Sequence, residues 1–228
     1  MSSNDGRKRL VIAVDGPAAS GKGTLARRLA AHYGLPYLDT GLLYRMVARA
    51  VLDAGHDIQD ADAAAAIVAS FDEAAFPDDS LRGREIGEAA SVVAAMPAVR
   101  SGLIARQRRF AGQPGGAVLD GRDIGTVICP EAGAKLFVTA TPEVRAARRH
   151  RELTGRGEPA TFEGILADIR RRDARDSGRS DAPLKLAEDA VLLDTSALTI
   201  EEAAGAAIGI VDARRAGVES PPGSAGGS

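Results

Sequence analysis

Residues 10–24 of this 228-residue chain read LVIAVDGPAASGKGT, and this stretch decides the fold. The apolar run 10–15 predicts a strand buried on both faces, and residues 22–33 after it predict a helix. A glycine-rich turn between a strand and a helix points several backbone N–H groups inward, at the positive end of the helix dipole. Lys22 can then extend along bound phosphates. We therefore expect a loop that holds a nucleoside triphosphate, made of Gly16, Pro17, Ala18, Ala19, Ser20, Gly21, Lys22, Gly23 and Thr24.

One departure from the strict phosphate-loop pattern concerns the metal ion. The pattern has Ser or Thr directly after the lysine, but here Gly23 stands at that position and Thr24 follows. Direct ligation of Mg²⁺ by the hydroxyl is therefore not assigned. We expect Mg²⁺ to be carried by the bound nucleoside triphosphate.

The composition excludes several classes of protein. With 29 basic and 31 acidic residues the formal net charge is −2, so no overall positive field draws the chain to nucleic acid or to anionic membranes. The single cysteine, Cys129, excludes an internal disulfide and a cysteine-based zinc site. The first apolar run is too short for a signal peptide, and none approaches the ~20 residues of a membrane span. We expect a cytoplasmic protein, with no membrane or nucleic-acid partner.

Short apolar runs alternate with helical patterns along the chain. Besides residues 10–15, the runs at 117–120, 134–140 and 190–194 predict strands of a buried parallel sheet. The helical patterns lie at residues 22–33, 42–54 and 97–110, after Thr141 and Pro142, and after the capping box at 199–202. This alternation predicts an α/β fold with three layers, in which helices cover both faces of a parallel sheet.

Two segments interrupt the alternation. Residues 57–90 are rich in Ala and Asp and predict a small, mostly helical excursion, and residues 154–161 predict a loop. Both are typical of movable covers over a central site. At the ends, we expect residues 1–9 to be flexible and residues 217–228, rich in Pro, Gly and Ser, to be disordered, which leaves 10–216 as the folded domain.

Four further stretches of the sequence carry a family resemblance. They are DTGLLYR (39–45), ASVVAAMPAVR (90–100), DGRDIGT (120–126) and RRRDARDSGR (170–179), the last followed by Ala182, Pro183 and Leu184. Together with the GKGT form of the phosphate loop, they resemble bacterial cytidylate (CMP) kinases, a family of nucleoside monophosphate kinases. The resemblance implies a P-loop kinase fold, with an acceptor-binding insertion at about 57–90 and a lid at about 154–179. It also implies phosphoryl transfer from ATP to CMP or dCMP.

Phosphoryl transfer to another phosphate brings many negative oxygens together, so it requires positive charge from several parts of the chain. The acceptor phosphate is already a nucleophile and needs no general base. The run 170–179 supplies such charge on one helical face. The residues on that face are Arg172, Arg175, Asp176 and Arg179, whereas Arg170 and Arg171 lie elsewhere. Taken alone, the run is also typical of an exposed helix with Arg–Asp pairs. Beside a phosphate loop and a movable cover, a phosphate clamp is the better interpretation.

The resemblance assigns roles to the acceptor-binding residues. Cytosine presents one amine donor and two acceptors, so a pocket that selects it needs a carboxylate and donor side chains. In the family these are Asp123, Arg100 and Ser91. The resemblance assigns Thr40, Arg45 and Arg122 to binding the acceptor phosphate, and Arg172 and Asp176 to binding the ribose. Arg179 is assigned to closing on the phosphates. Asp120 belongs to the same site with a less definite role.

The resemblance also implies the catalytic and donor-side residues. The groups expected to act on the transferred phosphoryl group are Lys22, Arg122, Arg179 and, as a weaker candidate, Arg175. Asp39 and Thr24 are expected near the metal ion, and Arg149 is expected to touch ATP, with Arg145 and Arg148 on the same helix face as weaker candidates. Compared with longer family members, residues 57–90 form a shortened insertion without convincing strand alternation, which bears on the fit of the base pocket.

Two other functions remain open from the sequence. One is a kinase for a different small acceptor, such as UMP, AMP or shikimate. The other is a nucleotide-sensing module that binds ATP in order to control a partner, for which a basic face or an effector domain would be typical. The small size and the movable covers favour a monomer.

Overall fold

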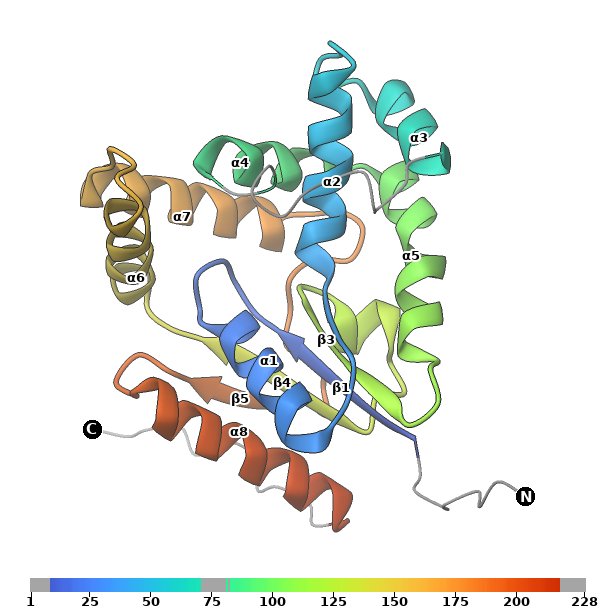
Figure 1. Ribbon diagram of the computed structural model, residues 1–228, viewed down its shortest axis with the longest axis vertical. Coiled ribbons are helices and arrows are strands. Elements are labelled where there is room, and N and C mark those ends of the chain that lie inside the picture. The colour runs from blue at the N-terminus through green and yellow to red at the C-terminus, as the bar shows by residue number, and fades with distance from the viewer. Residues whose placement is uncertain (1–8, 71–80, 82, 218–228) are drawn as a thin grey trace.

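A five-stranded parallel sheet forms the centre of the computed structural model, which describes residues 9–70, 81 and 83–217 (Figure 1). The strands are β1 (Leu10–Asp15), β2 (Tyr37–Asp39), β3 (Gly116–Gly121), β4 (Ala134–Thr139) and β5 (Val191–Asp194). Their order across the sheet is β2-β3-β1-β4-β5, and every neighbouring pair is parallel. The carboxyl ends of the strands therefore meet at one edge, where α/β proteins bind their ligands.

Helices cover both faces of the sheet. The helices are α1 (Lys22–Tyr33), α2 (Thr40–Asp53), α3 (Ala61–Ser70), α4 (Arg84–Val93), α5 (Pro97–Ala111), α6 (Pro142–Gly155), α7 (Phe162–Ser177) and α8 (Ile200–Arg215), with a π-helix, η3, at Ile124–Ile128. On β1, Ile12 and Val14 pack against α1 and α8, whereas Val11 and Ala13 pack against η3 and the end of α5. Successive side chains of a strand point to opposite faces, so both faces of this central strand are buried. This confirms the three-layer α/β fold.

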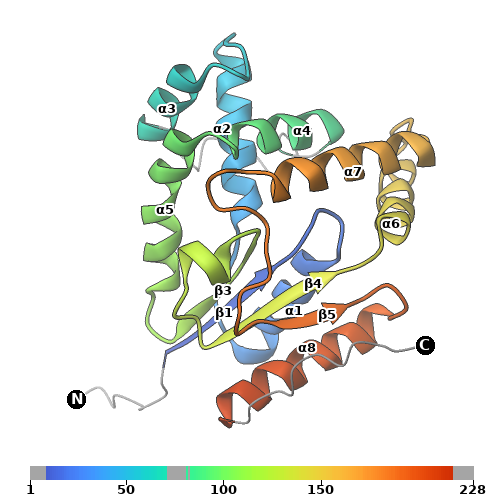
Figure 2. The same ribbon diagram turned by 180° about the vertical axis from the view of Figure 1, so that it is seen from behind.

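The remaining helices form two covers above the carboxyl edge of the sheet. Helices α2, α3, α4 and the first part of α5 share one apolar cluster, and α6 and α7 share another. Figures 1 and 2 both show α7 running beside α4 over that edge. Arg84 on α4 pairs with Asp168 on α7, and Glu88 on α4 lies 3.5 Å from Arg175 on α7. The two covers therefore contact each other above the carboxyl edge of the sheet.

Several elements differ from the sequence expectations. Strand β2 was not predicted because it has only three residues, and η3 was not predicted because it has five and lies between two strands. The interval 57–90 holds α3 and the start of α4, with no strand among its described residues; residues 71–80 and 82 lie outside the described part. The expected flexible start and disordered tail also lie outside it, apart from residues 9 and 217.

Within the described residues, no single helix is long and apolar enough to cross a membrane. The pair α4 and α5 reaches that length and composition only when the two are taken together, and they are bent by 98° at the break between them.

Candidate functional site

The phosphate loop has the backbone shape that its glycines permit. Gly16 has a φ of 151°, and a Cβ atom there would lie 2.0 Å from the carbonyl oxygen of Val138 on β4. Gly21, with a φ of 90°, ends the loop, and α1 begins at Lys22 without a side-chain cap. Uncapped N–H groups at a helix N-terminus are donors for an anion. The loop is thus pressed against the sheet and leaves the start of α1 open to phosphate.

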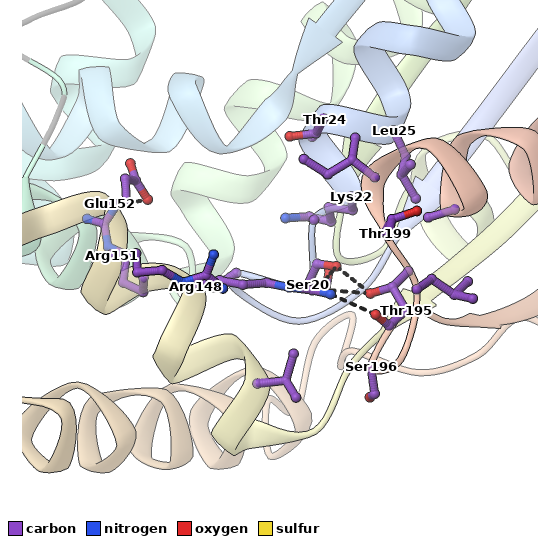
Figure 3. Close-up of a pocket in the computed structure, with 18 of the residues that line it drawn as sticks. Ser20, Lys22, Thr24, Leu25, Arg148, Arg151, Glu152, Thr195, Ser196 and Thr199 are labelled. Carbon is purple, nitrogen blue, oxygen red and sulfur yellow. Dashed lines mark hydrogen bonds and ion pairs between the residues drawn. The ribbon is translucent and has the colours of Figure 1, made fainter. Parts of the chain in front are cut away.

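A cavity of about 790 Å³ opens over this loop. Its wall consists of loop residues 19–24, the arginine-rich side of α6 and residues 195–200 after β5. Arg148 on α6 joins these parts: its guanidinium donates to the carbonyl oxygen of Thr195 at 2.7 Å, to Thr195 Oγ1 at 3.0 Å and to the carbonyl oxygen of Ser20 at 3.3 Å (Figure 3). The size of this cavity and its position on the loop suit the nucleotide that donates the phosphoryl group, and we call it the donor cavity.

Lys22 faces a carboxylate on the neighbouring strand. Its Nζ lies 3.6 Å from Oδ2 of Asp120 at the end of β3, and the hydroxyl of Tyr37 donates to Oδ1 of the same carboxylate at 2.6 Å. Burial, with a further contribution from Arg122, lowers the pKa of Lys22 to about 8. Burial also raises the pKa of Asp120. The carboxylate thus holds the lysine between the phosphate loop and the strand that carries the DGRDIGT motif.

A second cavity has a volume of about 50 Å³. Its lining includes eight of the residues expected to bind the acceptor: Thr40, Ser91, Arg100, Arg122, Asp123, Arg172, Asp176 and Arg179. Within it, buried Arg100 pairs with Asp123, and the Oγ atom of Ser91 is buried without a hydrogen-bond partner among the described residues. The structure therefore brings together residues from α2, α4, α5, the segment after β3, α7 and the turn after α7, as expected for an acceptor site.

One carboxylate organises the arginines of this cavity. Asp176 accepts hydrogen bonds from Nε of Arg122 at 2.8 Å and from Nη2 of Arg179 at 2.5 Å, and Nε of Arg172 lies 3.9 Å away. The Nε atoms of Arg172 and Arg179 are buried and have no hydrogen-bond partner among the described residues. These donors are oriented but only partly used, which is the state expected of a phosphate and ribose clamp.

The helix-face argument from the sequence holds only in part. Arg172 and Asp176 lie on α7 as expected, but the helix ends at Ser177, so Arg179 lies beyond it and reaches Asp176 from the following turn. Arg175 is absent from the linings of the described cavities and pairs with Glu88. The exposed side chains of Arg170 and Arg171 pair with Glu143 and Asp168, outside the acceptor cavity.

The remaining expected residues fall around the two cavities. Nη1 of Arg45 donates to the carbonyl oxygen of Leu81 at 2.8 Å, and Arg45 lines a third cavity, of about 170 Å³, together with Arg149 and Arg172. Arg149 also lines the donor cavity and pairs with Glu152 at 2.7 Å. Thr40 donates to the carbonyl oxygen of Asp120 at 2.8 Å.

Arg145 does not face the donor cavity. It is buried and pairs with Asp173 at 2.6 Å, and it also donates to the carbonyl oxygen of Ala18 at 3.2 Å. Arg145 on α6 therefore connects α7 to the phosphate loop. The helical spacing in the sequence did not show that Arg148 lines the donor cavity and Arg145 does not.

The residues near the loop suit Mg²⁺ that is mainly coordinated by phosphate and water. Thr24 and Asp39 line the donor cavity and offer oxygen donors, which Mg²⁺ prefers. Asp39 also caps α2, where it accepts a hydrogen bond from the N–H of Gly41 at 2.9 Å. No cluster of three or more His, Cys, Asp or Glu side chains that could hold a metal exists in the described part of the chain.

Asp15 supports the site through backbone hydrogen bonds, a role that the sequence did not indicate. At the end of β1, its carboxylate is 5% exposed and accepts the N–H of Ile124 at 2.8 Å and of Gly125 at 2.7 Å. Burial raises its pKa to about 7, against the opposing effect of these two N–H groups. The bonds fix the start of η3 and hence the position of Asp123 before it. The only signal in the sequence was a carboxylate directly before the glycine-rich turn.

Comparison with known proteins identifies the family of this chain. The chain matches the family model described as cytidylate kinase over residues 12–213. Cytidylate kinase of Xanthobacter autotrophicus is 66% identical over 91% of this chain and 100% of its own length, and that of Methylocella silvestris is 62% identical over 89% and 94%. An uncharacterised protein of known structure from Eubacterium ventriosum shares the fold, with a TM-score of 0.52 at 15% identity over 90% of this chain and 99% of that one. The chain belongs to the cytidylate kinase family.

Proposed function

We propose that this member of the family transfers the γ-phosphoryl group of ATP to CMP and dCMP, giving ADP and CDP or dCDP. The observation that carries the proposal is the acceptor cavity, in which the Arg122–Asp176–Arg179 cluster lies beside the Arg100–Asp123 pair. Cations for a phosphate and a charged pair for a base thus share one small space. Family membership makes the protein a nucleoside monophosphate kinase and does not favour another acceptor or a sensing role.

The donor nucleotide would lie along the phosphate loop. The open N-terminus of α1 and the ammonium group of Lys22 supply positive charge to its phosphates. Mg²⁺ carried by ATP, with Thr24 and Asp39 nearby, would add charge neutralisation at the transferred group. The residues of this chain position the phosphates and exclude water.

The acceptor phosphate would lie among the arginines. It is its own nucleophile, so the chain needs to align it and to stabilise the charge of the transition state. Arg122 and Arg179 present planar forks that bind phosphate oxygens in pairs, and Asp176 orients both. Because a nucleotide needs more room than about 50 Å³, the elements that line this cavity would have to open to admit it.

Cytosine would be recognised by three side chains that the structure already brings together. The carboxylate of Asp123 would accept from the exocyclic amine. Arg100 and the Ser91 hydroxyl, which has no hydrogen-bond partner among the described residues, would donate to the ring nitrogen and carbonyl oxygen. A site built from such buried polar groups discriminates strongly against a base that leaves them unpaired.

An assay of ADP release tests the proposal directly. The full chain is supplied with ATP and Mg²⁺ and, separately, with CMP, dCMP, UMP, AMP, GMP and shikimate. We expect strong turnover with CMP and dCMP, and a preference for CMP that falls at least tenfold in the Asp123→Asn variant. If only a different acceptor is turned over, the proposal that CMP is the substrate is wrong. If no acceptor stimulates the release of ADP, the proposed reaction is wrong.

A further inference from the structure

The turn after α7 contacts the base-reading arginine from the side of the lid. Oδ2 of Asp181 lies 3.2 Å from Nε of Arg100, although 81 positions separate the two residues. The Arg100 side chain is only 1% exposed, whereas that of Asp181 is 55% exposed. An exposed carboxylate of the turn after α7 thus reaches a guanidinium inside the acceptor cavity.

This contact completes a set of three that surrounds the guanidinium of Arg100. Nη2 donates to Asp123, Nη1 lies 3.5 Å from the hydroxyl of Tyr44, and Nε donates to Asp181. A guanidinium is a rigid planar fork, so acceptors on three of its sides fix the rotation of its plane. Asp181 is the partner that holds the Nε side.

The turn that carries Asp181 is itself held in an uncommon shape. Ala182 has a φ of 48°, is nearly buried and precedes Pro183, a position that disfavours helical conformations. The N–H of Leu184 donates to the carbonyl oxygen of Asp176 at 2.9 Å. Figure 2 shows this segment looping back beside the end of α7 before it runs down to β5. Such strained backbone persists where neighbouring contacts hold it.

The two contacts of the turn lead to the two halves of the acceptor site. Through Asp181 it reaches Arg100, the base side, and through Leu184 it reaches Asp176, which orients the phosphate arginines. Arg179, which closes on the phosphate, begins the same turn only two residues before Asp181. The turn therefore links base reading to phosphate binding.

We propose that Asp181 is a positioning residue that sets base selectivity by fixing the guanidinium plane of Arg100. The inference rests on the proposed function, in which Arg100 reads cytosine. Cytosine has an acceptor at ring position 3 where uracil has an N–H, so a guanidinium held in place favours CMP over UMP. When the guanidinium can rotate, that preference falls.

Steady-state kinetics on the full chain separate this role from a structural one. Asp181→Ala, Asp181→Asn and Asp181→Glu are compared with Glu188→Ala, which removes an exposed carboxylate from the same segment. We expect Asp181→Ala to raise KM for CMP about tenfold and to lower the CMP:UMP ratio of kcat/KM by a similar factor, the effect of one charge-assisted hydrogen bond. KM for ATP should change less than twofold. Asp181→Glu should recover part of the ratio, and Glu188→Ala should leave all values unchanged.

A lower melting temperature with an unchanged CMP:UMP ratio would show that the contact is only structural and would overturn the inference. The proposed function is tested separately, by the wild-type protein with CMP. If the wild type prefers another acceptor to CMP, the ratio of kcat/KM values is measured between that acceptor and the next best one. A ratio that is the same in Asp181→Ala as in the wild type then overturns the inference as well. If it turns over none, calorimetric dissociation constants for CMP and UMP give the ratio instead.

Discussion

Nε of Arg122 donates a hydrogen bond to Oδ2 of Asp176 over 2.8 Å, although the residues are 54 positions apart in the sequence. Burial acts to raise the pKa of Asp176, but Arg122, Arg179 and Arg172 outweigh it and hold the pKa below its ordinary value. The carboxylate therefore stays ionised and keeps together arginines that would otherwise repel one another.

Asp176→Asn should accordingly damage both stability and catalysis. The change leaves buried guanidinium groups without a counter-charge, and we expect the free energy of unfolding to fall by about 3 kcal/mol. We expect kcat/KM for CMP to fall at least 100-fold, because Arg122 and Arg179 lose their orientation. Denaturant unfolding and steady-state kinetics measure the two effects.

The pH dependence of this difference has a defined sign. A carboxyl with a lowered pKa in the folded state stabilises the protein above its unfolded pKa, near 3.8, and loses that contribution as the pH falls through the folded value. The stability gap between wild type and Asp176→Asn should therefore narrow in acid. Exposed Glu188→Gln, which lies outside the helices, serves as the control and should show no comparable gap at neutral pH. A gap that does not narrow at all as the pH falls below 3.8 would contradict the ion-pair explanation.

Arg179→Ala should remove turnover and leave the fold intact. Arg179 lies beyond the end of α7, and its hydrogen bond within the described structure is to Asp176. We expect kcat to fall about 100- to 1000-fold, the usual effect of losing one donor to a transition state, with an unchanged circular dichroism spectrum. Arg170→Ala, which removes an exposed arginine from the same run, should stay within twofold of wild type. Retained turnover in Arg179→Ala would make the run a solvated surface.

ATP capture should weaken on the alkaline side. Burial, with Arg122, lowers the pKa of Lys22 to about 8, so the free enzyme loses this positive charge as the pH rises through that value. We expect kcat/KM for ATP to fall above about pH 8, and Lys22→Arg, although less active, to lack that limb because arginine stays charged. Between about 8 and 10.5 the unfolded chain binds the extra proton, so this group makes stability rise with pH. A wild-type profile that is flat well above pH 8 would disprove the assignment.

Two glycine-to-alanine changes should have opposite effects on stability. In Gly16→Ala the new Cβ would lie 2.0 Å from the carbonyl oxygen of Val138, so we expect the free energy of unfolding to fall by more than about 3 kcal/mol, or the protein not to fold. In Gly205→Ala the Cβ would meet nothing within 4 Å on α8, and we expect a gain of about 0.5–1 kcal/mol. Thermal and denaturant unfolding give both values, and equal effects at the two sites would contradict the close packing of the loop.

The acceptor site shows where prediction from sequence reached its limit. The motifs indicated which residues belong to it, because each motif is contiguous. They did not show that Asp176 bonds Arg122 and Arg179, that Tyr37 bonds Asp120, or that Arg145 pairs with Asp173 and does not line the donor cavity. These partners lie on different elements, and their pairing depends on how the elements pack.

By itself, the sequence determined the phosphate loop, the parallel sheet and the family, since buried strands, glycine-rich turns and contiguous motifs are local patterns. Only the packing of the elements fixes which distant groups meet: the Asp15 carboxylate with the N–H groups that begin η3, Asp181 with Arg100, and Arg175 with Glu88. A local pattern fixes the conformation of its own segment. The distance between two charged side chains from distant segments is set only when the sheet and its covers pack together.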